Sequence, residues 1–316
     1  MDTRELFDRI ARLPVVAEGL ATSMVSGGFR SVFRGQGMEF DEARHYQWGD
    51  DARSIDWNAS TRLGTPFVKV YREERELSVM LLLDTSASMR SGISRPWGRG
   101  DGEKRLSPYE QSLLACALVA FSAERAGQRV GAFLFDRGID RVFPPRRGRA
   151  GVLAFVSGAL RPRESPPSAR GRSRLARVPP EERPSNIRAA ISSAGLLLKR
   201  RSMVVLASDF LSVGWEQEMG RLARRHDVIA IRAHDPGESD LPDMGLLSVA
   251  DPETGEKISA PTGSASFREA WSAWHSDRAD LWRSLCRRAG ASALDLPVTA
   301  DAASALSRFF ASRGGQ

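Results

Sequence analysis

The sequence contains only two cysteines and no long hydrophobic run, and each absence excludes a class of protein. Among its 316 residues, Cys116 and Cys286 both fall in patterns typical of helices. We therefore expect two buried thiols in a reducing compartment rather than a disulfide. No segment approaches the ~20 consecutive apolar residues that cross a bilayer. The first residues also lack the basic-then-apolar order of a signal peptide, so we expect a soluble cytoplasmic protein without a membrane span.

Sequence motifs of several enzyme classes are missing as well. The four histidines lie outside any recognisable nucleophile motif. Neither a Gly-x-Ser-x-Gly elbow nor a Gly-x-x-x-x-Gly-Lys-Ser/Thr phosphate loop occurs. Nucleophilic hydrolysis needs a serine or cysteine with a base within reach. The sequence therefore predicts a protein that is not an enzyme.

Positive charge is concentrated in one segment rather than spread along the chain. The whole chain carries 46 Lys+Arg and 39 Asp+Glu, a formal net charge of +7. Residues 141–183 contain eleven arginines and three glutamates. Because residues 161–183 are also rich in proline and poor in large apolar side chains, we expect them to form a mobile basic loop. Nucleic-acid binding through this loop stays an alternative, although a recognisable nucleic-acid module is missing.

From residue 77 onwards, apolar segments typical of strands alternate with segments typical of helices. The runs at 77–83 and 203–207 are almost wholly apolar, as in central strands that are covered on both faces. Such alternation predicts an α/β fold with a mostly parallel sheet flanked by helices. We expect a main domain of residues 76–312, preceded by an N-terminal segment of residues 1–75 that packs on it.

Large aromatic residues recur towards the end of the chain. Phe267, Trp271, Trp274 and Trp282 share helical spacing within residues 263–289. This spacing predicts one amphipathic helix. We expect its tryptophans to face the core rather than to bind a ligand.

Three polar residues alternate directly after the first apolar strand. Asp84, Ser86 and Ser88 follow the run at 77–83. They therefore lie at the carboxyl end of a strand, where open α/β sheets bind ligands. One carboxylate and two hydroxyls on a short loop can converge on one point. Such hard oxygen ligands suit Mg²⁺, with Mn²⁺ or Ca²⁺ as alternatives, and they disfavour zinc.

Two further residues are expected to complete this site. Asp209 follows the apolar run at 203–207 much as Asp84 follows its own run. If the two strands are neighbours, both carboxylates lie at the same sheet edge and together balance the charge of a divalent cation. Ser185 begins a predicted helix and would deliver a third hydroxyl from a neighbouring loop.

This arrangement resembles the metal-ion-dependent adhesion site of von Willebrand factor A domains. The family pattern is Asp-x-Ser-x-Ser, then a threonine, then an aspartate, and it is matched by Asp84, Ser86, Ser88 and Asp209. The threonine position falls on Ser185, which keeps the hydroxyl but lacks the methyl group that stiffens the rotamer. The resemblance implies a von Willebrand factor A-like, Rossmann-like fold. It also implies a bound metal that is completed by an Asp or Glu of a partner protein.

A segment before the first apolar strand is similar to the signature of a bacterial family called domain of unknown function 58. The similar stretches are Gly35-x-Gly37-x-Glu39-Phe40, Arg44-x-Tyr46, Gly49-Asp50-Asp51-x-Arg53-x-Ile55-Asp56-Trp57 and Glu73-x-x-Glu76. For that family the resemblance implies a MoxR-type AAA+ ATPase as partner and an adaptor or chaperone-like role. A metal-dependent phosphohydrolase with Asp84 as nucleophile stays an alternative. Enzymes of that kind usually have a second aspartate where this chain has Ser86.

Overall fold

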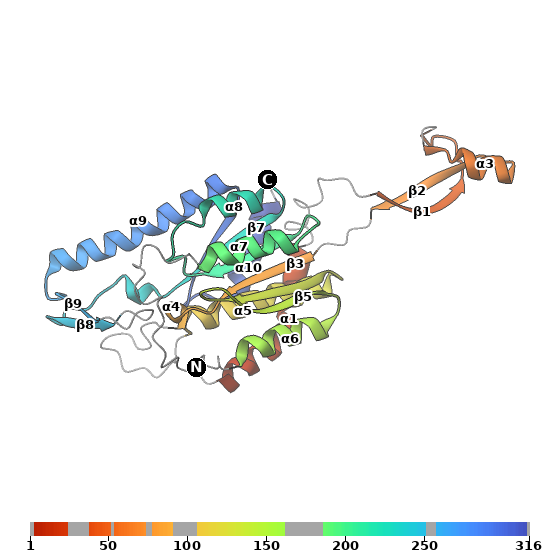
Figure 1. Cartoon of the computed structure of the whole chain (residues 1–316). Helices are drawn as coiled ribbons and strands as arrows, with labels where there is room; N and C mark the ends of the chain where they lie inside the picture. Colours follow the sequence, from red (N-terminus) through yellow and green to blue (C-terminus); the bar gives the residue numbers. More distant parts are fainter. Residues whose placement is uncertain are drawn as a thin grey trace, which may run out of the picture. The chain divides into compact units, whose positions relative to one another are not determined.

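The computed structural model describes residues 3–24, 38–51, 54–73, 78–90, 106–161, 186–250 and 257–314 (Figure 1). The chain divides into two compact units. Residues 33–76 form the smaller unit, and residues 1–32 together with 77–316 form the main unit. The first helix, α1 (Thr3–Ser23), thus groups with the main unit.

A six-stranded sheet forms the centre of the main unit. Its strands lie in the order β10-β7-β6-β3-β4-β5. Their bounds are β3 (Ser78–Asp84), β4 (Arg129–Phe135), β5 (Ile139–Arg146), β6 (Met203–Ser208), β7 (Asp227–His234) and β10 (Ser292–Pro297). Every neighbouring pair is parallel except β4 and β5, which run antiparallel. This architecture confirms the predicted mostly parallel α/β sheet, and it is consistent with a Rossmann-like or von Willebrand factor A-like fold.

Helices cover both faces of the sheet, and this explains why its central strands are apolar throughout (Figure 1). Alternate residues of a strand point to opposite faces. On one face, Met80 and Leu82 share a core with three helices. These are α7 (Asn186–Leu197), α8 (Glu216–Ala223) and α9 (Ala265–Ala289). The other face is covered by α5 (Pro108–Arg125), which packs against α1, α6 (Arg149–Leu160) and α10 (Ala302–Gly314).

The smaller unit contains an antiparallel strand pair and a short helix. These elements are β1 (Met38–His45), β2 (Phe67–Glu73) and α3 (Trp57–Leu63). Arg44 donates hydrogen bonds to both carboxylate oxygens of Asp50, at 2.8 and 2.7 Å. The Asp56 side chain caps α3 by accepting hydrogen bonds from backbone N–H groups of its first turn. These signature residues therefore have structural roles within the unit.

Three expectations about individual side chains and segments can be compared with the structure. Both cysteines are free and buried, as predicted. Among the described helices, none is long and apolar enough to cross a membrane.

Trp282 is 4% exposed, but Trp274 is 47% exposed, so the expectation that the tryptophans face the core was wrong for Trp274. The reason is that the buried residues of α9 lie only in its second half, from Ala279 onwards.

Candidate metal centre

Asp84 and Asp209 lie at the same edge of the sheet. β3 and β6 are neighbouring parallel strands, and their register pairs Leu83 with Ala207. Asp84 is the last residue of β3, and Asp209 comes one residue after the end of β6. Because parallel strands present their carboxyl ends at one edge, the two carboxylates occur together there. The condition set by the sequence, that the two strands be neighbours, is met.

The Asp84 carboxylate is buried and accepts a hydrogen bond on each oxygen. The residue is 1% exposed. Its Oδ1 accepts from the backbone N–H of Ser86 at 2.9 Å, and its Oδ2 accepts from the Ser208 hydroxyl at 2.6 Å. These two bonds hold the carboxylate in one orientation at the end of β3. Sequence reasoning missed Ser208, although its position directly before Asp209 was an available signal.

The hydroxyls of Ser86 and Ser88 lie beside each other on the segment that follows β3. Their Oγ atoms are 3.1 Å apart. Ser86 lies in the turn directly after Asp84, and Ser88 lies in the short helix α4 (Ala87–Arg90). The structure therefore places both predicted hydroxyls together, and one of them belongs to Ser86, the residue whose N–H donates to Asp84.

Electrostatics at this edge favour a bound cation. Burial, together with the nearby charge of Asp209, raises the pKa of Asp84 from 3.8 to about 7, against the opposing hydrogen bonds from Ser208 and Ser86. A desolvated carboxylate beside a second carboxylate is unfavourable unless a proton or a cation compensates the charge. The side-chain donors here are all hard oxygens, so a cation such as Mg²⁺ fits them better than zinc does.

The turn after Asp209 has an unusual backbone conformation. Phe210 has a φ of 54°, in the left-handed region that residues other than glycine rarely adopt. Oδ1 of Asp209 accepts from the Leu211 N–H at 2.9 Å. The Phe210 N–H donates to the Ser208 Oγ at 3.1 Å, so Ser208 links this turn to Asp84. Strained backbone of this kind tends to occur at functional sites.

The remaining predicted ligand lies outside the described residues. Ser185 directly precedes Asn186, the first residue of α7, so its role as a third hydroxyl stays a prediction. The predicted basic loop at 161–183 also lies outside them, except for its first residue. Within the described ranges, no group of three or more His, Cys, Asp or Glu side chains could hold a metal ion. A metal site here would therefore depend on two carboxylates and on serine hydroxyls.

Comparison with known proteins assigns most of the chain to one sequence family. Residues 42–280 match the family described as "Protein of unknown function DUF58". The chain belongs to the DUF58 family. Uncharacterized proteins of Mycobacterium tuberculosis and Mycobacterium bovis are each 29% identical to it over 317 residues, which is 99% of this chain and 91% of each relative. An uncharacterized protein of Mycobacterium avium is 38% identical over 117 residues, covering 36% of this chain and 68% of that protein.

In this DUF58 chain the acidic region extends beyond the two predicted aspartates. Burial, with contributions from Asp235 and Asp209, raises the pKa of Glu238 from 4.5 to about 7. Glu238 ends a short helix, η5 (Pro236–Glu238), which follows β7, the neighbour of β6 in the sheet. Sequence reasoning missed Glu238, because nothing in the residues around it indicates that it is partly buried. Acidic side chains thus continue along the sheet edge from β3 to β7.

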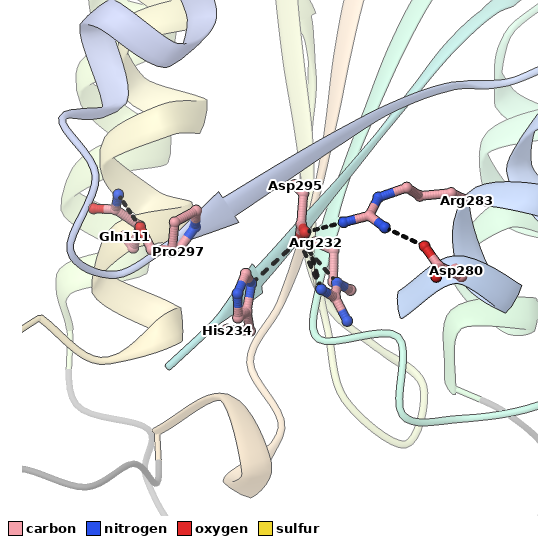
Figure 2. A network of polar contacts seen from close by, with 7 residues as sticks. All are labelled: Gln111, Arg232, His234, Asp280, Arg283, Asp295 and Pro297. Atoms are coloured by element: carbon pink, nitrogen blue, oxygen red, sulfur yellow. Dashed lines mark hydrogen bonds and ion pairs between the residues drawn. The ribbon is translucent and has the colours of Figure 1, made fainter. Parts of the chain in front are cut away.

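A network of charged side chains fixes α9 of the DUF58 protein beside the sheet (Figure 2). Asp295 on β10 accepts hydrogen bonds from Arg232 on β7 at 2.9 and 3.0 Å and from Arg283 on α9 at 2.9 Å. Nδ1 of His234 lies 3.2 Å from the same carboxylate. Burial alone would raise the pKa of Asp295, but its hydrogen bonds with His234 and Arg232 hold that pKa well below its usual range. The Asp295 carboxylate therefore stays ionised near neutral pH and, through Arg283, joins α9 to the sheet.

Proposed function

We propose that this protein is a divalent-metal-dependent protein-binding adaptor or chaperone-like partner. The proposal depends on one observation, that a buried carboxylate, a second carboxylate and two hydroxyls occur together at the ends of neighbouring strands. The proposed site holds Mg²⁺, directly or through water, by five side chains: Asp84, Ser86, Ser88, Ser185 and Asp209.

Charge and coordination chemistry support this assignment. Two carboxylates balance one divalent cation, and the raised pKa of the buried Asp84 indicates that the pair gains from such compensation. Mg²⁺ prefers six oxygens in an octahedron and retains waters, so a few protein ligands leave positions open to an outside ligand. A partner Asp or Glu would take one of these positions. The hydroxyls of Ser86 and Ser88 supply no strong base, which suits holding a carboxylate better than cleaving a bond.

The partner that we propose is a MoxR-type AAA+ ATPase. Its support is the resemblance of the signature segment and of the Asp-x-Ser-x-Ser pattern to families in which that pairing is expected. Membership in DUF58 and the mostly parallel sheet agree with this resemblance at the level of family and fold.

The experiment is a titration of the purified protein against the ATPase in Mg²⁺ and in EDTA. We expect binding in Mg²⁺ and a loss of at least tenfold in affinity in EDTA or in an Asp84→Ala protein. Glu269→Ala, which removes an exposed carboxylate from α9, is the matched control and should bind as the wild type does. Equal binding by the wild type in Mg²⁺, by the wild type in EDTA and by Asp84→Ala would remove the metal from the mechanism.

The same proteins test the phosphohydrolase alternative. Phosphatase activity with Mg²⁺ that disappears in Asp84→Ala but persists in Glu269→Ala would favour an enzyme. The position two residues after Asp84 is a serine, so the acid that such enzymes usually carry there is missing. We therefore expect no turnover above the level of the Asp84→Ala protein.

A further inference from the structure

Arg278 on α9 lies next to the Asp209 turn and is only partly solvated. Its Nη2 donates a hydrogen bond to the backbone carbonyl of Phe210 at 3.2 Å, and its guanidinium carbon lies 5.2 Å from the centre of the Trp274 ring. Burial and the charge of Arg232 lower its pKa, whereas the charge of Asp209 raises it. Among the described residues, no carboxylate forms an ion pair with this guanidinium. Arg278 is therefore a half-buried cation that lies near Asp209, one of the candidate metal ligands.

The position of Arg278 is fixed by the packing of α9. Trp282, one turn further along the helix, packs against the ring of Phe210 with centroids 5.4 Å apart. Arg283 joins the helix to Asp295 of the sheet at 2.9 Å, as Figure 2 shows. The guanidinium is thus held between a backbone carbonyl and an aromatic ring rather than free in solvent. A pre-positioned planar guanidinium loses little conformational entropy when it binds a carboxylate.

Exposed apolar side chains lie on the two segments that hold this cation. Leu211 and Val213, which follow directly after the Asp209 turn, are 48% and 78% exposed, and Trp274 is 47% exposed. Apolar groups that surround a charged contact exclude water and strengthen it. A ligand that fits this surface therefore combines one negative charge with aliphatic neighbours.

We propose that Arg278 is a second anchor for the carboxylate of the partner protein. This inference rests on the proposed metal-dependent binding. One oxygen of the partner's Asp or Glu would take a position on the metal, and the other would accept a charge-assisted hydrogen bond from Arg278. The aliphatic residues on either side of that acid would contact Leu211 and Val213. The recognised segment is thus an acidic residue between aliphatic side chains, on a partner protein.

The experiment uses the full chain, Mn²⁺ as the metal and acetate as the carboxylate probe. Water-proton relaxation reports Mn²⁺ binding, and its decrease on adding acetate reports replacement of metal-bound water. We expect acetate to bind the Mn²⁺-loaded wild-type protein about tenfold more tightly than the Arg278→Gln protein, the size of one charge-assisted hydrogen bond. Arg278→Lys, which keeps the charge but not the planar fork, should recover part of this affinity. Arg287→Gln removes an exposed arginine from the same helix and should leave it unchanged.

The outcomes separate the inference from the function on which it rests. If Mn²⁺ binds in an Asp84-dependent way but acetate binds equally to the wild-type, Arg278→Gln and Arg278→Lys proteins, then the second anchor is wrong and the metal site stands. If the wild-type protein shows no Asp84-dependent Mn²⁺ binding, the proposed function itself fails. A merely structural role for Arg278 would lower the melting temperature of the variants without changing acetate affinity at saturating Mn²⁺, and this too would overturn the inference.

Discussion

Replacing Asp84 by asparagine should stabilise the metal-free protein and abolish its response to Mg²⁺. The side chain is 1% exposed and lies near a second carboxylate, so its charge costs stability when no cation is bound. Asparagine has the same shape. It retains one acceptor for the Ser86 N–H and offers an amide group to the Ser208 hydroxyl, so the hydrogen bonds of the turn can persist. The substitution therefore removes the charge with little other change.

The size of the effect follows from the perturbed ionisation of the carboxyl group. Raising the pKa of Asp84 from 3.8 to about 7 corresponds to about 4 kcal/mol at pH 8, because each pKa unit is worth about 1.36 kcal/mol. Imperfect hydrogen bonding of the amide offsets part of this, so we expect a net gain of about 2 kcal/mol. As the pH falls, the folded wild type takes up a proton at Asp84 at a higher pH than the unfolded chain does. The difference between the proteins should therefore shrink as the pH falls from 7 to 4.

Urea unfolding in EDTA at pH 8 measures this difference, with Asp240→Asn as a control for loss of an exposed carboxylate. Repeating the measurement in Mg²⁺ should stabilise the wild-type and Asp240→Asn proteins but not Asp84→Asn. A lower unfolding free energy for Asp84→Asn than for the wild type in EDTA would refute the reasoning. It would mean that the carboxylate serves as a structural acceptor whose charge is already compensated without a metal.

Three further predictions concern the scaffold. Burial, together with the nearby positive charge, lowers the pKa of His226 to about 4. The unfolding free energy of the wild type should therefore fall by about 2 kcal/mol between pH 7.5 and pH 5. Urea titrations at both pH values should show that His226→Gln lacks this part of the loss. Gly131→Ala would place a methyl group 2.8 Å from the Phe143 carbonyl oxygen and the Pro145 nitrogen. The substitution should therefore lower the unfolding free energy in urea by about 2 kcal/mol. An unchanged urea midpoint would show that β5 moves freely. Burial raises the pKa of Cys116 to about 12, so a thiol reagent at pH 8 should label it only after unfolding, and rapid labelling of the native protein would contradict its burial.

The two aspartates of the candidate site could be placed from the sequence because two almost wholly apolar runs are each followed by polar residues. A strand that is buried on both faces has no polar residues until it leaves the sheet, so the first aspartate marks its end. That reasoning placed Asp84 and Asp209 at strand ends, and the pairing of β3 with β6 confirmed that the strands are neighbours. The alternation of strands and helices similarly predicted the mostly parallel sheet.

Other parts of the site depend on contacts between distant segments, which no local pattern contains. Ser208, Glu238 and Arg278 come from three different elements, and each contributes only through its burial or its partner in space. The periodicity of α9 predicted a helix but overestimated its buried length, because only its second half reaches the core. Trp274 is therefore at the surface, where its ring supports Arg278 instead of filling the core.

The strained Phe210 turn explains how these distant segments act on one site. Its N–H is held by Ser208, which also binds Asp84, and its carbonyl is held by Arg278 of α9. Its ring packs against Trp215 and Trp282, with centroids 5.3 and 5.4 Å away. A left-handed residue other than glycine persists only where several contacts determine its conformation together. The placement of the Asp209 carboxylate is thus set by the core packing of α9 as well as by its own loop, so a metal at Asp84 and a partner on α9 would act on the same turn.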